Sequence, residues 1–236
     1  MREKGVTLIE VLIAVTLLSI LSVGMFLAMR IGLNAYSKAD DRMMDNRRAA
    51  GAQRILQEEM EGLVPVIATC GAGAGGGGAL TKTVFFQGEP EVMRLVSTFS
   101  LQQGWRGQPQ VLELFVIPGE REGVRLVVNE ILYTGPSGAG RFCTGARQFL
   151  AVDSGPQSFV LADKLAYCRF SFLAPAKDPT APPIWVQRWS TETWPLAVRV
   201  EMAPLAADAS RVQPISVTAP IYLHRNPDIP YADLAY

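Results

Sequence analysis

The strongest pattern in the chain is the long apolar run near its amino terminus. Residues 1–10 read MREKGVTLIE, and residues 11–29 contain no charged side chain. A helix over residues 6–29 would rise about 36 Å, enough to cross a hydrocarbon core of about 30 Å. A secretory signal peptide has a shorter apolar core, about 7–15 residues, and ends at a small-x-small cleavage site. No such site ends this run, so the pattern predicts an uncleaved membrane helix over residues 6–29.

Helical periodicity continues beyond this apolar run. Apolar residues recur there every three to four positions among charged neighbours, at Ala35, Ala39, Met43, Ala52, Leu56, Met60 and Leu63. The spacing predicts that the helix continues over residues 30–65, is closed by Pro65 and packs one face on the domain that follows. Gly24, Gly32 and Gly51 each weaken a helix by up to about 1 kcal/mol relative to Ala, so these positions favour bending.

A glycine-rich segment follows the predicted helix. Gly71–Gly78 reads GAGAGGGG, and backbone amides of glycine-rich turns can hold phosphate groups. The Gly-Lys-Ser/Thr ending that such loops require is missing, and Lys82 comes too late to replace it. We therefore expect a flexible connector over residues 66–82 and assign it no ligand.

From Thr83 onward the pattern changes to the period of two that is typical of β-strands. Runs rich in β-forming residues, separated by Gly and Pro, lie at residues 84–87, 91–100, 111–117 and 124–133. We expect a β-rich head over residues 83–225 and a Pro-rich tail over residues 226–236. The predicted fold class is α+β, with a long amino-terminal helix packed on a mostly antiparallel sheet.

Later strands show which faces should be buried. The clearest alternation places Leu196, Val198, Val200 and Met202 inward and Ala197, Arg199 and Glu201 outward. A second alternating set is Ile215, Val217, Ala219, Ile221 and Leu223. Over residues 165–173 the apolar face carries Ala166, Cys168, Phe170 and Phe172. Cys168 is therefore expected to be a core residue or a disulfide partner rather than a reactive thiol.

Composition limits the function classes. The formal net charge is zero, so nothing indicates a basic surface for nucleic acid. Cys70, Cys143 and Cys168 would allow one disulfide and one free thiol in an oxidising compartment, and the sequence leaves all three pairings open.

Candidate catalytic and metal-binding residues are scarce. The single histidine, His224, is too little for a two-histidine metal site, and no Gly-x-Ser-x-Gly elbow is present. Asp228 and Asp233 could supply oxygens to calcium, but ordered calcium loops place several acids close together. We therefore expect no enzyme activity, cofactor or metal. Trp185, Trp189 and Trp194 are expected to pack in the core, with a subunit contact as the alternative.

Glu10 is the anomaly of the apolar run. An ionised carboxylate at the centre of a membrane helix costs about 2.5–3.5 kcal/mol on insertion scales. Residues 11–29 contain no basic side chain that could pair with it, so the cation could come from another molecule.

Residues 5–10, which read GVTLIE, resemble the class III signal of type IV pilins and type II secretion pseudopilins. The resemblance implies that a prepilin peptidase cuts after Gly5 and methylates the new amino terminus, Val6. It also implies that Glu10 pairs with the terminal amine of a neighbouring subunit during assembly. The family usually has Phe where this chain has Val6, a mild departure that keeps an apolar residue. The alternative is a plain signal anchor with Glu10 near the membrane interface.

Residues 161–203 resemble the J-type minor pseudopilin of type II secretion. The similar segments read LADKLAYCRFSF and IWVQRWSTETWPLAVRVEM. This resemblance implies a structural subunit at the tip of a pseudopilus, anchored in the bacterial inner membrane with a periplasmic head. The implied partners are I-like and K-like minor pseudopilins, the major pseudopilin, the prepilin peptidase and the inner-membrane assembly platform. The alternatives are a minor pilin of a type IV pilus and an anchored periplasmic ligand-binding protein.

The processing hypothesis predicts the amino terminus of the mature chain. Replacing Gly5 by the bulky residue Leu should block cleavage, so Gly5→Leu protein extracted from membranes should begin at Met1. The unaltered protein and a Gly32→Leu control should begin at Val6. Amino-terminal sequencing and intact mass measure both. Unaltered protein that still begins at Met1 would contradict the hypothesis.

Overall fold

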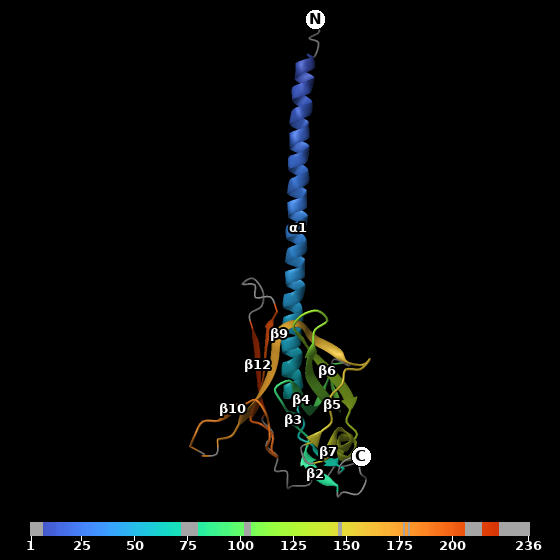
Figure 1. Cartoon of the computed structure of the whole chain (residues 1–236), viewed down its shortest axis with the longest axis vertical. Coiled ribbons are helices and arrows are strands. Elements are labelled where there is room, and N and C mark those ends of the chain that lie inside the picture. The colour runs from blue at the N-terminus through green and yellow to red at the C-terminus, as the bar shows by residue number, and fades with distance from the viewer. Residues whose placement is uncertain are drawn as a thin grey trace. The chain divides into compact units, whose positions relative to one another are not determined.

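The computed structural model describes residues 7–71, 80–101, 105–145, 148–176, 178, 180–205 and 214–221. The chain divides into two compact units, Met1–Arg47 and Arg48–Tyr236. The first unit is the amino-terminal part of helix α1 (Leu8–Glu61), and the second contains the last turns of α1 and the β-rich head. Figure 1 shows these elements along the chain.

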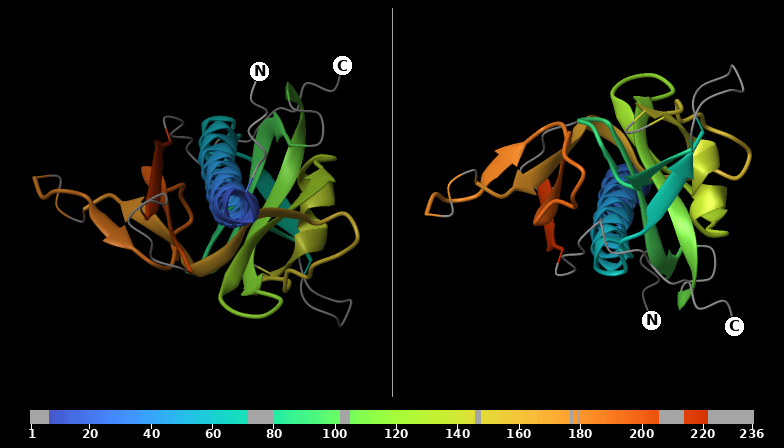
Figure 2. Two further views of the ribbon diagram at one scale, coloured as in Figure 1. Left: turned by 90° about the horizontal axis from the view of Figure 1, so that it is seen from above. Right: turned by 90° about the horizontal axis from the view of Figure 1, so that it is seen from below.

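The head is built on an eight-stranded antiparallel sheet with the order β12-β11-β9-β6-β5-β4-β3, and β10 pairs with β9 beside this path. Its strands are β3 (Gln87–Gly88), β4 (Val92–Ser100), β5 (Trp105–Pro118), β6 (Val124–Leu132), β9 (Phe159–Ala174), β10 (Ile184–Val186), β11 (Ala197–Pro204) and β12 (Ile215–Pro220). The sheet curves around the last turns of α1, with β11 and β12 on one side and β4 and β5 on the other (Figure 2). The predicted fold class, a long apolar helix with a mostly antiparallel sheet, is confirmed.

A smaller group of elements lies beside the main sheet. It consists of the two-stranded sheets β1 (Ile67–Cys70) with β2 (Thr81–Val84) and β7 (Cys143–Gly145) with β8 (Gln148–Phe149), the short helix α2 (Pro136–Ala139) and the 3-10 turn η1 (Gly140–Phe142). The approach between η1 and β1 is close, because a Cβ on Gly140 would lie 2.0 Å from the Thr69 carbonyl oxygen. Glycine is therefore required at position 140.

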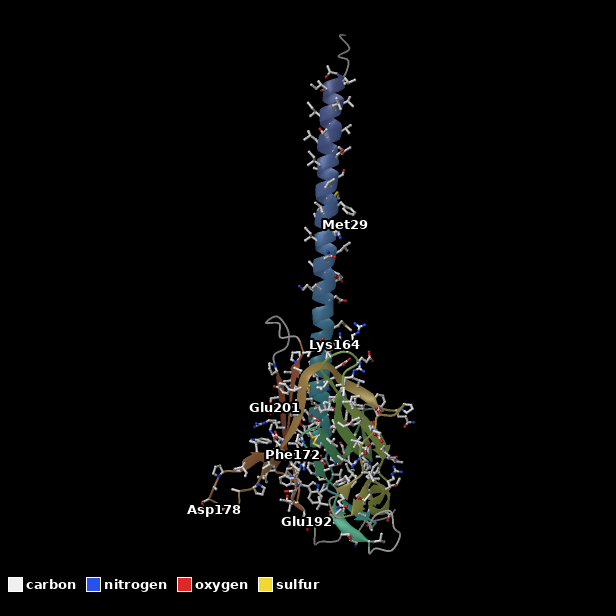
Figure 3. The ribbon with its side chains drawn as sticks, in the orientation of Figure 1. Met29, Lys164, Phe172, Asp178, Glu192 and Glu201 are labelled. Atoms are coloured by element: carbon white, nitrogen blue, oxygen red, sulfur yellow. A yellow bond between two sulfur atoms is a disulfide. The ribbon has the colours of Figure 1, made fainter. Side chains whose placement is uncertain are left out.

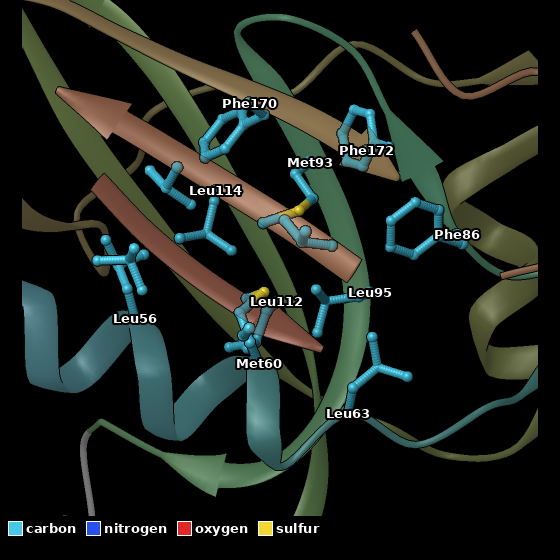
Figure 4. Packing of buried hydrophobic residues seen from close by; sticks show 14 of the residues in the cluster. Leu56, Met60, Leu63, Phe86, Met93, Leu95, Leu112, Leu114, Phe170 and Phe172 are labelled. Carbon is cyan, nitrogen blue, oxygen red and sulfur yellow. The ribbon is translucent and has the colours of Figure 1, made fainter. Parts of the chain in front are cut away.

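The main core lies between the last turns of α1 and the inner face of the sheet. Leu56 and Met60 of α1 are fully buried there, together with Leu63 just beyond the helix. They meet side chains from β4, β5 and β9, and Figure 4 shows Leu95, Leu112 and Phe170 among them. The helix thus supplies the apolar cover that an antiparallel sheet needs on its inner face.

A second core covers the other face of β4 and β5. Cross-strand partners Leu95 and Leu112 face the main core, whereas the next pair, Val96 and Val111, belongs to the second core. Its buried members are Val66, Ala68, Cys70, Phe85, Val96, Val111, Ala139 and Cys143. Because both faces of these central strands are covered, their apolar residues form nearly continuous runs instead of a clean alternation.

The helix ends earlier than predicted, and the expected connector is partly strand. Helix α1 ends at Glu61 instead of reaching Pro65, and β1 and the start of β2 lie within residues 66–82. Backbone pairing explains the early end, because Leu63 forms a bridge with Ser97 and the Val64 amide donates to the Val96 carbonyl. Most of the glycine-rich segment and the tail over residues 226–236 lie outside the described residues.

Several predicted side-chain positions were also wrong. Ala35, Ala39 and Met43 are exposed, so only the later part of the helical stripe is buried. Ala166 is exposed because β9 is irregular there: Ala203 is opposite Tyr167 and Pro204 is opposite Leu165, which leaves Ala166 without a partner in the register. Leu165 takes the buried place instead. The single strand expected over residues 84–87 is interrupted. Strand β2 ends at Val84 and β3 begins at Gln87, so Phe85 and Phe86 lie between two strands.

Strand β11 follows the predicted alternation at its centre but departs from it at its start. Val198, Val200 and Met202 are buried and Glu201 is exposed, as predicted. Leu196, expected inward, is only half-buried. Ala197, expected outward, is buried, since this small residue lies between Leu173 and Pro220 in the register.

The tryptophans divide into two kinds. Trp189 and Trp194 are buried in the main core, and the Trp189 indole N–H donates to the Thr193 carbonyl at 2.7 Å. Trp185 is only half-buried, and the Arg199 guanidinium lies over its ring at 3.8 Å from the centroid. The expectation of core packing is therefore wrong for Trp185. Its strand, β10, lies off the main path of the sheet, where Trp185 pairs with Leu173 of β9.

The helix–sheet core predicts a large effect of truncating Leu56. Replacing this fully buried side chain by Ala should lower the free energy of unfolding of the head by about 2–5 kcal/mol. Gln53→Ala, an exposed change on the same helix, should alter it by less than about 0.5 kcal/mol. Urea unfolding of the full chain in mild detergent, followed by tryptophan fluorescence, measures both. Equal effects of the two changes would contradict the packing.

Candidate functional site

The first part of α1 offers an uncovered apolar surface. Its segment Leu8–Asp40 is long and apolar enough to cross a membrane, and none of its most apolar stretch is buried within the chain. At 1.5 Å per residue this segment rises about 50 Å, more than the roughly 30 Å hydrocarbon thickness. Figure 3 shows its side chains pointing outward all round, with Met29 among them.

Hydroxyl groups in this segment are satisfied inside the helix. Thr16, Ser19 and Ser22 each donate to a backbone carbonyl three or four residues earlier, at 2.8 Å. Hydrocarbon offers no alternative partner for such groups, so internal bonding is what a membrane helix requires. The polar residues between positions 11 and 29 therefore do not argue against a membrane span.

Glu10 lies in the first turn of α1 and is exposed in the single chain. The amides of Glu10 and Val11 donate to the Thr7 carbonyl at 3.1 Å and 3.3 Å, which forms this turn. The positive end of the helix dipole favours a carboxylate at this position. The first basic side chain after Glu10 is Arg30, about 30 Å further along the helix, so residues 11–29 cannot neutralise it.

The predicted processing residues Gly5 and Val6 lie outside the described residues. His224, Asp228 and Asp233 also lie outside the described part of the chain. Within the residues that are described, no group of three or more His, Cys, Asp or Glu side chains is arranged to hold a metal ion.

The structure decides the cysteine pairing that the sequence leaves open. Cys70 at the end of β1 is bonded to Cys143 at the start of β7, across a sequence separation of 73. Both cysteines belong to the second core. The bond therefore ties the segment after α1 to the elements that cover the outer face of β4 and β5.

Cys168 is the remaining cysteine, and it is free and buried in the main core. Burial, followed by the nearby charge of Glu91, raises the pKa of its thiol to about 12. The thiolate is the reactive form, so Cys168 is inert at neutral pH, as its place on the apolar face of β9 predicted.

A buried ion pair on the outer face of the sheet was not foreseen. Arg94 of β4 is 1% exposed, and its Nε donates to Glu113 of β5 at 2.8 Å. Its other nitrogens donate to the Gln87 side chain at 2.7 Å and to the Leu150 carbonyl at 3.1 Å, while Asn129 donates to Glu113 at 2.9 Å. Burial lowers the pKa of Arg94, and Glu113 opposes this shift. Such a pair is tolerated because nearly every polar atom has a partner.

The same arginine holds the small covering elements in place. Its guanidinium lies 5.5 Å and 5.4 Å from the ring centroids of Phe142 and Phe149, which come from η1 and β8. Arg94 thus connects the main sheet to the disulfide-linked elements through both hydrogen bonds and cation–π contacts. Its position between buried Met93 and Leu95 gave no sequence signal, since both faces of β4 are covered.

Glu59 is a further buried charged residue that the sequence did not lead us to expect. Its side chain lies on the same face of α1 as Leu56 and is 1% exposed. Its position three residues after Leu56 in the apolar stripe was a usable signal, because residues three apart share a helix face.

Comparison with known proteins gives one finding for the amino terminus. A model of the prokaryotic N-terminal methylation motif matches residues 1–26. This match places the chain in the type IV pilin-like superfamily and implies processing by a prepilin peptidase and assembly in the membrane with pilin-like partners. The motif and the apolar helix together indicate a membrane-anchored, single-pass protein. No curated protein sequence is significantly similar to this chain.

The disulfide predicts a thiol count and a stability change. The denatured chain should show one reactive thiol before reduction and three afterwards, which a thiol-specific reagent measures. Removing the bond by Cys70→Ser, Cys143→Ser or both should lower the free energy of unfolding by about 2–5 kcal/mol, because the cross-link restricts the unfolded chain.

The single and double variants should show similar losses, since either change removes the same bond. Cys168→Ala, the matched control, should leave the count of disulfide-bonded cysteines unchanged. Three reactive thiols in the unreduced protein would contradict the pairing.

Proposed function

We propose that this chain is a J-like minor pseudopilin of a type II secretion system. In this role it is a structural subunit at the tip of a periplasmic pseudopilus, and it takes part in assembly and in the export of folded proteins. The observation that carries the proposal is an acid, Glu10, which lies within the methylation motif and in the first turn of an uncovered apolar helix. The resemblance of residues 161–203 to the J-type subunit supports the specific assignment.

In this proposal the helix acts through two kinds of contact. Its apolar surface first holds the chain in the inner membrane and then packs against the helices of other subunits. Glu10 pairs with the amine of Val6 of a neighbouring subunit, which is free after cleavage at Gly5. An uncompensated carboxylate in hydrocarbon costs up to about 2.5–3.5 kcal/mol, the value at the membrane centre. The ion pair therefore favours one relative position of neighbouring subunits along the helix axis.

The disulfide supports a periplasmic head. Bonds of this kind form and persist in oxidising compartments, of which the bacterial periplasm is one. Cys70 and Cys143 both lie in the unit that begins at Arg48, beyond the membrane segment. We therefore place the amino terminus in the cytoplasm and the head in the periplasm. The expected partners are I-like and K-like minor pseudopilins, the major pseudopilin and the inner-membrane assembly platform. The role is structural, without enzyme activity.

The second candidate is a minor pilin of a type IV pilus. The methylation motif favours it equally, because both assemblies use the same processing signal. Adhesion, motility or DNA uptake would then replace secretion. An anchored periplasmic ligand-binding protein is a more distant alternative, since it would leave Glu10 without a role.

Replacing Glu10 tests the proposal. In cells that lack the native copy, Glu10→Ala should abolish recovery of the chain with I-like and K-like subunits and should reduce secretion of folded proteins. The head should remain folded, as its intact disulfide reports, because Glu10 lies outside the head unit. Glu122→Ala, an exposed acidic residue of the head, is the matched control and should behave like the unaltered chain.

The outcomes separate the candidates. Normal secretion and normal copurification with Glu10→Ala would contradict the role of Glu10. Loss of surface pili or of motility with unchanged secretion would support the minor pilin instead.

A further inference from the structure

A buried acid lies in the joint between α1 and the sheet. Glu59 is in the last turn of the helix, between the core residues Leu56 and Met60 in the sequence, and it is 1% exposed. Neither of its carboxyl oxygens has a hydrogen-bond partner among the residues that the structure describes. An ionised carboxylate in such a place is very unfavourable, whereas a protonated one is far less so.

The surroundings of Glu59 disfavour a negative charge. The pKa of its carboxyl group is raised to about 8; burial is the largest cause, and the charges of Glu130 on β6 and of Glu58 on α1 act in the same direction. The Ser97 hydroxyl on β4 is close enough to favour the carboxylate, although its geometry is not that of a full hydrogen bond, and it does not offset burial. Glu130 itself is held by the Ser100 hydroxyl and by the Leu101 amide, so it is fixed on the inner face. The Glu58 carboxylate is paired with Arg54 at 2.9 Å.

The end of the helix fits closely against β4, and the Glu59 side chain beside this contact is itself removed from water. The Gly62 carbonyl accepts hydrogen bonds from the Thr98 amide at 2.9 Å and from the Thr98 hydroxyl at 3.3 Å. A Cβ on Gly62 would lie 2.6 Å from the Ser97 hydroxyl oxygen and 3.2 Å from the Phe99 amide nitrogen. A charge on Glu59 can therefore be hydrated only if the helix end separates from β4.

We propose that the proton on Glu59 fastens the end of α1 to the sheet and that its loss loosens this joint. The joint holds the head on the helix that carries the membrane segment, so the device makes this attachment sensitive to pH. The inference does not depend on the proposed secretion role. It concerns only the packing of the last turns of α1 within the head unit.

The direction of the pH effect follows from linkage. The ordinary pKa of a glutamate is 4.5 and that of Glu59 in the folded chain is about 8. Between these values the folded state holds one proton more than the unfolded state, so stability falls as pH rises. The equilibrium constant for unfolding should increase by up to about tenfold per pH unit in this window and should not change through Glu59 outside it.

The test is urea unfolding of the full chain in mild detergent from pH 5 to pH 9. We expect Glu59→Gln, which mimics the protonated form, to remove most of the tenfold rise per pH unit. Glu58→Gln, the adjacent acid that is paired with Arg54, removes only the smallest cause of the raised pKa, so it is the matched control and should keep most of the rise. An unchanged rise in Glu59→Gln, or an equal loss of the rise in Glu58→Gln, would overturn the proposal.

Hydrogen exchange locates the effect. At pH 9 the amides of residues 52–64 should exchange several-fold faster in the unaltered chain than in Glu59→Gln, and at pH 5 the two should match. Comparison at one pH cancels the intrinsic pH dependence of exchange. Equal protection at pH 9 would overturn the proposal. If Glu59→Gln does not fold, Glu59→Met provides the same comparison. If neither variant folds at pH 5, the joint needs the carboxyl group in another way, and the proposal fails.

Discussion

The packing of the last turns of α1 against the inner face of the sheet is the contact on which the head depends. An antiparallel sheet needs cover on at least one face, and Leu56, Met60 and Leu63 provide it over strands that come from distant parts of the sequence. Each fully buried aliphatic side chain of this kind contributes about 1.5–3 kcal/mol by removal from water. The same helix is apolar all round in its first part, where the cover must come from lipid or from other subunits.

The outer face of the sheet is covered in a different way. There the Cys70–Cys143 bond and the ion pair of Arg94 with Glu113 hold short elements that have few residues of their own. A buried ion pair is stable only when its remaining polar atoms are bonded, and Gln87, Asn129 and the Leu150 carbonyl meet this need. Glu59 on the inner face lacks such partners. The free-energy cost of burying its side chain therefore depends on whether the carboxyl group is protonated.

Sequence reasoning reached the features that depend on local pattern. The apolar helix, the β-rich head and the burial of Cys168 follow from periodicity along a single segment. It failed where a residue's environment is set by distant strands. Ala166 is exposed because β9 is irregular opposite Ala203 and Pro204, and Trp185 is partly exposed because β10 lies beside β9. The helix ends at Glu61 because Leu63 and Val64 pair with β4, a partner that no local signal names.

The sequence by itself determined that a carboxylate, Glu10, lies within a processing motif at the start of an apolar helix, since both are properties of consecutive residues. It also determined the fold class, because periods of 3.6 and two residues are readable along the chain. Only the tertiary structure decided which cysteines are bonded, which tryptophans are buried, and that Arg94 and Glu59 are removed from water on opposite faces of one sheet. Those outcomes depend on contacts between segments that are far apart in sequence, and a one-dimensional pattern carries no information about which segments meet.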